Sequence, residues 1–269
     1  MSTIREQPER VEQKKKKRPR WIDLEGISMV WERDMIRFLR MRTRLYGGMV
    51  RSLVWLFALG LGLRRSFVPA GDMDYAQFIL PGIIAMSIIF SAIQSAISIV
   101  WDREFGFLKE ILVAPVPRAT VVLGKALGGA TTATVQGGVV LLLAPLAKIH
   151  LTPLQVLLGG SAMFLTALCM SSLGIVIAAR LTDFESFSSL QNFITMPMFL
   201  LSGAIFPLLD LPRWFHLVLL ANPLTYGVDL IRGTLIGWHA QVLYVDVAVL
   251  AAITVVLLIW SIRLFESEG

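Results

Sequence analysis

Long runs of apolar residues without a single charge constrain this chain more than any other feature. Phe78 to Val100 and Leu151 to Ala179 are uncharged throughout, and each is longer than the about 20 residues that an α-helix needs to cross a membrane. In the whole sequence 55% of residues are hydrophobic and only 16% are charged, whereas soluble domains carry about 25% charged residues. The chain is therefore predicted to be an all-α integral membrane protein.

The apolar pattern predicts one membrane domain, residues 23–265, with six transmembrane helices. The first of these is the weakest, because only Ser52 to Leu63 is free of charge. Extending it back to Leu45 includes Arg51, whose side chain would have to reach the membrane interface. The six predicted spans cover residues 45–63, 78–100, 121–147, 151–179, 186–209 and 243–262.

A broken apolar stretch, Trp214 to Trp238, lies between the fifth and sixth predicted spans. Asn222-Pro223 divides it into halves that are each too short to cross a membrane, which predicts a re-entrant hairpin on the outer side. Asn222 and Pro223 would form its turn. Tyr226, Asp229 and Arg232 would either satisfy one another or close an outer gate, and the three-residue spacing favours a local ion pair between Asp229 and Arg232.

Lys and Arg are distributed unevenly along the chain. With six spans, twenty of the 25 lie on the side of the N-terminus, and loops rich in Lys and Arg stay in the cytoplasm. Both termini of this multi-pass protein are therefore predicted to be cytoplasmic, at the inner membrane. Residues 1–22, which include Lys14 to Arg20, are predicted to form a disordered basic tail able to bind anionic lipid. Residues 266–269 form a second short tail, and a nucleic-acid partner is disfavoured in so apolar a chain.

Residues 23–45 have the spacing of an amphipathic helix. A helix with a basic face opposite a Trp/Phe/Leu face is typical of one that lies in the membrane interface, and an ordinary surface helix of a small cytoplasmic domain is the alternative. The basic face consists of Arg33, Arg37, Arg40 and Arg44, and the apolar face of Ile27, Trp31, Met35, Phe38 and Leu45.

The charged segment 101–118 lies between the second and third spans. Phe105, Leu108 and Leu112 recur at helical spacing, and Pro115 and Pro117 would end such a helix. A short amphipathic helix of this kind suits docking into a groove of a partner protein. A solvated loop resting on the bilayer fits the spacing equally well.

The sequence offers no arrangement of residues that is typical of an enzyme. Its three His lack metal-ligand spacing, and no phosphate-binding Gly-rich loop is present. The centres of the strong spans carry almost no ionisable groups of the kind that couple ion flow to transport. No catalytic residue, metal or cofactor is predicted, and energy for any uphill transport would have to enter through the cytoplasmic loops.

Two stripes of partly polar side chains could line a translocation path. The alternative in both cases is ordinary helix packing. The first stripe, in the second span, is Ser87, Ser91, Gln94, Ser95 and Ser98, and the second, in the fifth span, is Asn192, Met196, Phe199 and Ser202.

Over about residues 25–265 the sequence resembles the membrane subunits of type-2 ABC exporters. Three motifs carry the resemblance: Trp101 to Arg118 with the following Leu123-Gly124-Lys125, Leu201 to Pro207, and Asn222 to Arg232. The similarity is closest to the subgroup that exports daunorubicin-type drugs and nodulation-type lipo-oligosaccharides, and these two cargoes stay open.

The resemblance implies a permease that forms a homodimer, or a heterodimer with a related permease, and binds two copies of a cytoplasmic ATPase subunit. ATP-driven closure would press on a coupling helix and open a path for an amphipathic drug-like or lipid-like molecule. The residues implied for coupling are Glu104, Phe105, Gly106, Leu108, Glu110, Pro115 and Arg118. A non-transporting membrane anchor remains an alternative, and a gated channel is disfavoured by the lack of charged rings.

Overall fold

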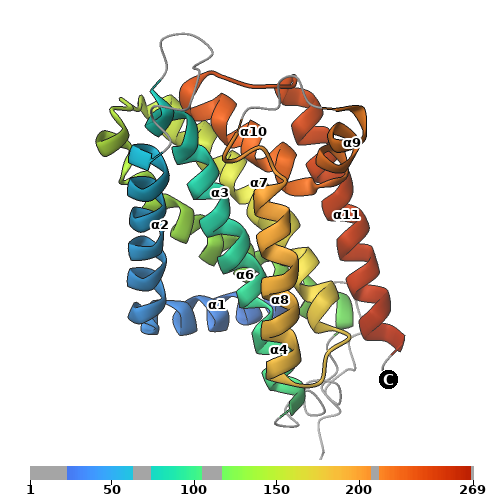
Figure 1. Ribbon diagram of the computed structural model, residues 1–269. Coiled ribbons are helices and arrows are strands. Elements are labelled where there is room, and N and C mark those ends of the chain that lie inside the picture. The colour runs from blue at the N-terminus through green and yellow to red at the C-terminus, as the bar shows by residue number, and fades with distance from the viewer. Residues whose placement is uncertain (1–22, 63–73, 105–116, 207–211, 268–269) are drawn as a thin grey trace, which may run out of the picture.

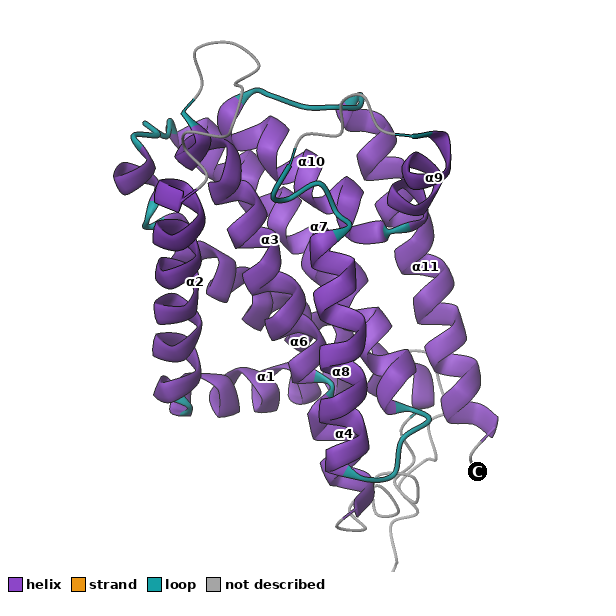
Figure 2. Ribbon diagram, in the orientation of Figure 1, coloured by secondary structure: helices purple, strands orange, loops and turns teal. Residues whose placement is uncertain are grey.

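The protein is helical throughout the part of the chain that the structure describes. The computed structural model describes residues 23–62, 74–104, 117–206 and 212–267, and the all-α prediction is confirmed for them (Figure 2). The elements are α1 (Leu24–Arg40), α2 (Arg42–Gly62), α3 (Tyr75–Ser95), α4 (Ile97–Glu104), α6 (Arg118–Leu141), the 3-10 helix η1 (Ala144–Ala147), α7 (Pro153–Ala178), α8 (Phe184–Leu200), α9 (Arg213–Ala221), α10 (Pro223–Ile236) and α11 (Leu243–Ser267).

The long helices run back and forth between two ends of a bundle (Figure 1). Helix α2 leads away from α1, α3 and α4 return, and α6, α7, α8 and α11 continue the alternation. Helices α1 and α4 lie at one end, together with the last turn of α11, and this end is called the α1 end below. Helices α9 and α10 lie at the opposite end, called the hairpin end, and α1 runs crosswise to α2.

Among the described residues, three helical segments are long and apolar enough to cross a membrane: Tyr75–Glu104, which joins α3 and α4, Pro153–Ala178 and Leu243–Glu266. The other three predicted spans are helical but fall short by this measure. Helix α2 is strongly apolar only over Leu45–Gly60, α6 contains Lys125 and several small polar residues, and α8 has only 17 residues. Length and composition of the described helices thus support three of the six predicted crossings.

Burial separates a central helix from a peripheral one. In Tyr75–Glu104, 78% of the most apolar 18-residue stretch is buried inside the protein, against 22% of the corresponding stretch in Leu243–Glu266. Helix α3 packs against α2, α6, α7 and α10, so its apolar side chains form the core of the bundle. Helix α11 covers α7 and α10 with one face and leaves large apolar side chains such as Val256 and Trp260 exposed on the other.

Proline and capping residues set several of the helix ends. Helix α7 begins at Pro153 after the capping residue Thr152, as the fixed φ of Pro favours. At the start of α8 the backbone N–H of Ser186 donates to Asp183, and this bond holds the pKa of that carboxyl below its usual value. The third span ends earlier than predicted, since α6 stops at Leu141 and Pro145 lies in η1.

The second predicted span is divided into two helices at Ala96. The N–H of Ala96 donates to Ile93 O and the N–H of Ile99 donates to Ala96 O, so the chain turns more tightly here than in an α-helix. Gly174 of α7 packs directly on this break, where a Cβ would lie 2.9 Å from the Cα of Ile93. Helix α4 therefore continues the run of α3 beyond one tighter turn at Ala96.

The amphipathic helix α1 packs against α6 through the face that was predicted to rest in the membrane. Phe38 is 2% exposed, and Trp31 Nε1 donates to Thr131 Oγ1 on α6. The two helices approach closely at Gly124, because a Cβ at this position would lie only 2.7 Å from Val30, and small residues of this kind allow close helix packing. The face that α1 leaves exposed carries Leu24, Met29, Ile36 and Leu39 together with Arg33, Arg37 and Arg40.

Candidate functional site

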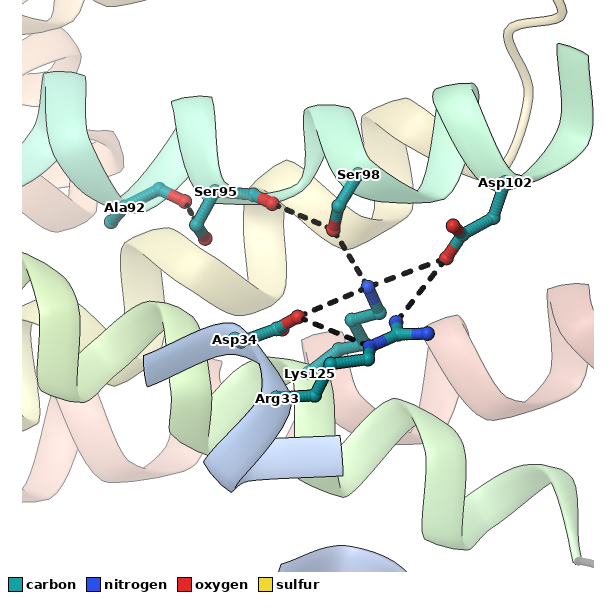
Figure 3. Close-up of polar contacts among 7 residues, drawn as sticks. All are labelled: Arg33, Asp34, Ala92, Ser95, Ser98, Asp102 and Lys125. Atoms are coloured by element: carbon teal, nitrogen blue, oxygen red, sulfur yellow. Dashed lines mark hydrogen bonds and ion pairs between the residues drawn. The ribbon is translucent and has the colours of Figure 1, made fainter. Parts of the chain in front are cut away.

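A buried lysine stands at the centre of a polar cluster at the α1 end (Figure 3). Lys125 of α6 is 5% exposed, and its Nζ donates to Ser98 Oγ on α4 at 2.7 Å. The same Nζ lies 3.5 Å from Asp34 Oδ1 on α1 and 3.5 Å from Asp102 Oδ2 on α4. One ammonium group thus joins α4 and α6 to α1, which lies far from both in the sequence.

Arg33 completes the cluster from the exposed side. Its Nη2 lies 3.4 Å from Asp102 Oδ2 and its Nε lies 3.8 Å from Asp34 Oδ1. Two cations and two carboxylates therefore balance, as charges removed from water require. The side chain of Arg33 is 50% exposed, so Lys125 is the buried cation that neutralises the two carboxylates. We call Arg33, Asp34, Ser98, Asp102 and Lys125 the Lys125 cluster.

Part of the predicted polar stripe continues from this cluster along α4 into the end of α3. Ser98 Oγ donates to Ser95 O and Ser95 Oγ donates to Ala92 O (Figure 3). Ser87 and Ser91 are 1% and 6% exposed inside the bundle. The hydroxyls of Ser95 and Ser98 therefore bond to backbone carbonyls three residues earlier along α3 and α4.

A cavity of about 380 Å³ lies beside the Lys125 cluster, between α1, α3, α4, α6 and α8. Its wall includes the predicted path residues Gln94 and Ser95. At its rim Arg37 stacks on Trp101 with its Cζ 5.7 Å from the ring centroid, and Trp101 meets Phe184 edge-on. The lining is mixed, with aromatic rings beside hydroxyl, amide and carboxylate groups, which suits an amphipathic molecule.

The path residues predicted on α8 do not line this cavity. Asn192 is exposed and Met196 is 38% exposed, whereas Phe199 is fully buried. The ring of Phe199 packs edge-on against Trp55 of α2, with centroids 6.1 Å apart. Asn192 and Met196 are therefore exposed on α8 while Phe199 is buried against α2, and a translocation path along this face of α8 stays a prediction.

Asn222 holds the turn between α9 and α10 at the hairpin end, and Pro223 follows as the first residue of α10. The Oδ1 of Asn222 accepts from Leu224 N, while its Nδ2 donates to Met198 O and Leu201 O at the end of α8. Tyr226 donates from its hydroxyl to Leu220 O on α9. The turn is thus closed by its own polar side chains, as the Asn-Pro pair predicts.

Asp229 and Arg232 do not form the predicted ion pair with each other. Asp229 accepts 2.7 Å hydrogen bonds from the N–H groups of Ala240 and Gln241. Arg232 is 2% exposed and donates to Gly203 O and Ala204 O. Its guanidinium also lies 3.9 Å from the ring centroid of Phe78. Each side chain therefore has its hydrogen-bond partners in a different segment, and the Nε of Arg232 has no partner among the described residues.

Comparison with known proteins identifies the family to which this arrangement belongs. The profile of the ABC-2 type transporter family matches residues 25–236, from α1 to α10. The chain belongs to the ABC-2 type transporter family. This result confirms the resemblance drawn from the three motifs.

Named relatives of this ABC-2 permease agree with the family. It is 30% identical to nodulation protein J of Rhizobium leguminosarum bv. trifolii, over 77% of this chain and 80% of that protein. It is 28% identical to the inner membrane transport permease YadH of Escherichia coli K12, over 90% and 94%. It is 25% identical to the putative transport permease ycf38 of Cyanophora paradoxa, over 78% and 73%.

The predicted coupling residues of the permease fall largely outside the described residues. Phe105, Gly106, Leu108, Glu110 and Pro115 all lie there. Glu104 is the exposed last residue of α4. Arg118 opens α6, and its Nη1 donates to Phe265 O and Glu266 O. Because the last carbonyls of a helix have no partner within it, Arg118 caps α11.

Sequence reasoning did not identify Asp34 and Asp102 as partners of Lys125. The signal that was present is Lys125 itself, since a lysine inside an apolar span needs a carboxylate partner. Asp34 and Asp102 belong to segments that were interpreted separately, as the interface helix and the 101–118 segment. A search for acidic residues at the same predicted membrane face would have brought the three together.

Asp246 of α11 is a second buried charge that sequence reasoning did not single out as a site residue. It is fully buried, and neither of its carboxylate oxygens has a hydrogen-bond donor among the described residues. Asp229 lies close enough to interact with it through the side chains. Two ionised carboxylates cannot form a hydrogen bond with each other, because neither carries a hydrogen to donate. A hydrogen bond between Asp229 and Asp246 therefore requires a donor at one of the two positions.

We expect Asp246→Asn to stabilise the permease, because the amide supplies that donor and removes an unsatisfied charge. An unsatisfied buried polar group costs about 1–3 kcal/mol, and each kcal/mol corresponds to about 2–4 °C in a protein of this size. The measurement is the midpoint of thermal aggregation in detergent. Asp246→Leu is the control, since it removes the charge without adding a donor. A lower midpoint for Asp246→Asn than for the unchanged protein would contradict this account.

Proposed function

We propose that this ABC-2 permease is the membrane subunit of an ATP-driven exporter that moves an amphipathic molecule out across the cytoplasmic membrane. In this proposal two permease chains form the path, and two copies of a separate ATPase subunit bind at the α1 end. In this proposal the permease is not itself an enzyme, and its function needs no catalytic residue, metal or cofactor of its own.

The proposed topology has six crossings with the α1 end in the cytoplasm. The alternating course of α2, α3–α4, α6, α7, α8 and α11 between two ends supports six crossings (Figure 1). At about 1.5 Å per residue, α2 and α6 are long enough to cross the about 30 Å hydrocarbon core. The 17 residues of α8 reach about 26 Å. The excess of Lys and Arg in segments at the α1 end supports the orientation.

The position of α4 is the observation that carries the proposal. Helix α4 ends at Glu104, where the sequence that resembles a coupling helix continues. On one side Asp102 joins it to α1 and α6 through the Lys125 cluster. On the other side Arg103 donates to Leu181 O and Ala179 O just after α7. A partner docked on residues 105–116 would therefore act on the bundle through α4.

The mixed cavity beside α4 is the best candidate for the cytoplasmic opening of the path. It combines aromatic rings with the amide of Gln94 and the hydroxyl of Ser95, which is the lining that an amphipathic cargo requires. The exposed apolar side chains of α8, including Phe193, would face lipid or the second permease chain. The proposed dimer could place Asn192 and Met196 against the other half of the path.

A lipo-oligosaccharide is the second candidate cargo, and the similarity to nodulation protein J favours it. Both candidates are amphipathic, so the mixed lining of the cavity supports either. A non-transporting membrane anchor is a further alternative. An anchor would not need the cavity, and substitutions in its wall would then have no effect on activity.

Affinity purification of the tagged permease from its native membrane tests the proposed function. We expect an ATPase subunit to co-purify in equal amounts and the complex to hydrolyse ATP. Glu104→Arg should reduce hydrolysis per permease by about tenfold, because a like-charge contact across an interface costs several kcal/mol. Glu32→Arg, at an exposed acidic position on α1, is the matched control and should leave hydrolysis unchanged.

Other outcomes of the same purification would redirect the interpretation. A stable permease that brings down no ATPase would favour the anchor. Equal hydrolysis in Glu104→Arg and Glu32→Arg would remove Glu104 from the coupling surface. Leu108→Asp extends the test to the apolar side of the 101–118 segment, where loss of activity is expected if that side fills a groove of the partner.

A further inference from the structure

Helix α4 is short and follows a tighter turn at the end of α3, so its position has to be fixed by contacts with its neighbours. It contains only eight residues, Ile97–Glu104, and the tight turn at Ala96 precedes it. A helix this short has little stability of its own. Ser98, Asp102 and Arg103 supply its polar attachments to α6, α1 and the chain after α7.

Lys125 is the group that connects most of these attachments. Its Nζ contacts Ser98 and Asp102 on α4 and Asp34 on α1, all within 3.5 Å. Without this ammonium group, Arg33, whose side chain is half-exposed, would be the only counter-charge to Asp34 and Asp102 among the described residues. Two carboxylates beside one cation repel each other, and solvent weakens the remaining attraction.

We propose that Lys125 is a positioning residue that makes α1 and α6 move together with α4 when the ATPase acts on the permease. This inference rests on the proposed function and assigns a role to the buried cluster within it. With Lys125 in place, α4 cannot turn about Ala96 without separating the ammonium group from Ser98 and Asp102. Movement of α4 is then transmitted to the crosswise helix α1 and to the base of α6.

Removal of Lys125 should therefore separate ATP hydrolysis from the movement of the bundle. To keep the protein folded, Lys125→Met is combined with Asp34→Asn, which leaves Arg33 and Asp102 as a balanced pair. This double variant lacks the link between α4 and α6 without an excess buried charge. Lys125→Arg keeps the positive charge and is the conservative variant.

The experiment is amide hydrogen exchange in α1 (Leu24–Arg40) of the complete permease–ATPase complex. The nucleotide-free complex is compared with the complex trapped by ATP and vanadate. We expect the unchanged protein and Lys125→Arg to show a nucleotide-dependent difference in exchange. In the double variant, exchange in α1 of the trapped complex should equal exchange in the nucleotide-free complex, while ATP hydrolysis continues. A purely structural lysine would not produce this separation.

Each other outcome decides against the inference. A nucleotide-dependent difference of unchanged size in the double variant would show that Lys125 does not transmit the movement. Asp102→Asn, which weakens the link from the α4 side, guards against a folding defect of the double variant. If both variants fail to assemble, the cluster serves folding and the positioning role is rejected. Absence of an ATPase from the unchanged complex would reject the exporter function and this inference together.

Discussion

Simultaneous charge reversal of Asp229 and Arg232 is expected to leave the permease as poorly folded as either single reversal does. The reason is that the two side chains have different partners. Asp229→Arg would place a cation against the N–H groups of Ala240 and Gln241. Arg232→Asp would place an anion against the carbonyls of Gly203 and Ala204. Each mismatch should cost about 3 kcal/mol or more, because a buried charge loses its partners.

The measurement is the yield of monodisperse protein by fluorescence-detected size-exclusion chromatography, before and after heating. Arg213→Asp on the exposed start of α9 is the matched control and should give an ordinary yield. Recovery of folded protein in the double reversal would instead support the ion pair between Asp229 and Arg232 that the three-residue spacing predicts. Single variants that fold normally but change cargo passage would instead favour an outer gate.

The hairpin shows which parts of the fold the sequence could predict. Asn222-Pro223 predicts a helix start locally, because Asn caps the first turn and Pro favours the next position, and α10 begins there. The partners of Arg232 were beyond sequence reasoning. They are backbone carbonyls of Gly203 and Ala204, and every residue in the chain has such a carbonyl. Nothing in the spacing of Asp229 and Arg232 reveals a better partner elsewhere.

Helix α8 shows a similar limit for the path. The periodicity of Asn192, Met196 and Phe199 is real, but it does not say which neighbour each side chain will meet. Phe199 is buried against Trp55 of α2, a helix about 140 residues earlier in the chain. Spacing predicts a helical face, whereas the contacts of that face depend on how the bundle packs.

One part of the Lys125 cluster can be predicted from the sequence, and another part depends on how the helices pack. That Lys125 requires an acidic partner follows from the sequence, because an unpaired lysine in an apolar span is too costly. That Asp34 is one of its partners depends on the close approach of α1 and α6 at Gly124, where a side chain would collide with Val30. A small residue such as Gly124 favours close helix packing in a membrane. The helix that packs on it was identified only in the structure.

Lys125→Met alone is expected to cause the largest loss of folded protein among substitutions at the α1 end. It leaves Asp34 and Asp102 close together in a site where the lysine is 5% exposed. Removing one partner of a buried ion pair costs about 3–5 kcal/mol. Lys148→Met, the same change at an exposed lysine, is the matched control and should give nearly normal yield.

The double variant Lys125→Met/Asp34→Asn should recover much of that yield, because it restores the charge balance with Arg33 and Asp102. The comparison separates two contributions of the same lysine. Recovery of folding shows that the single variant fails through uncompensated negative charge, and not through loss of packing around the lysine stem. Equal stability of Lys125→Met and Lys148→Met would contradict the role given to Lys125. An ammonium group that can be removed without loss of stability does not hold α1, α4 and α6 together.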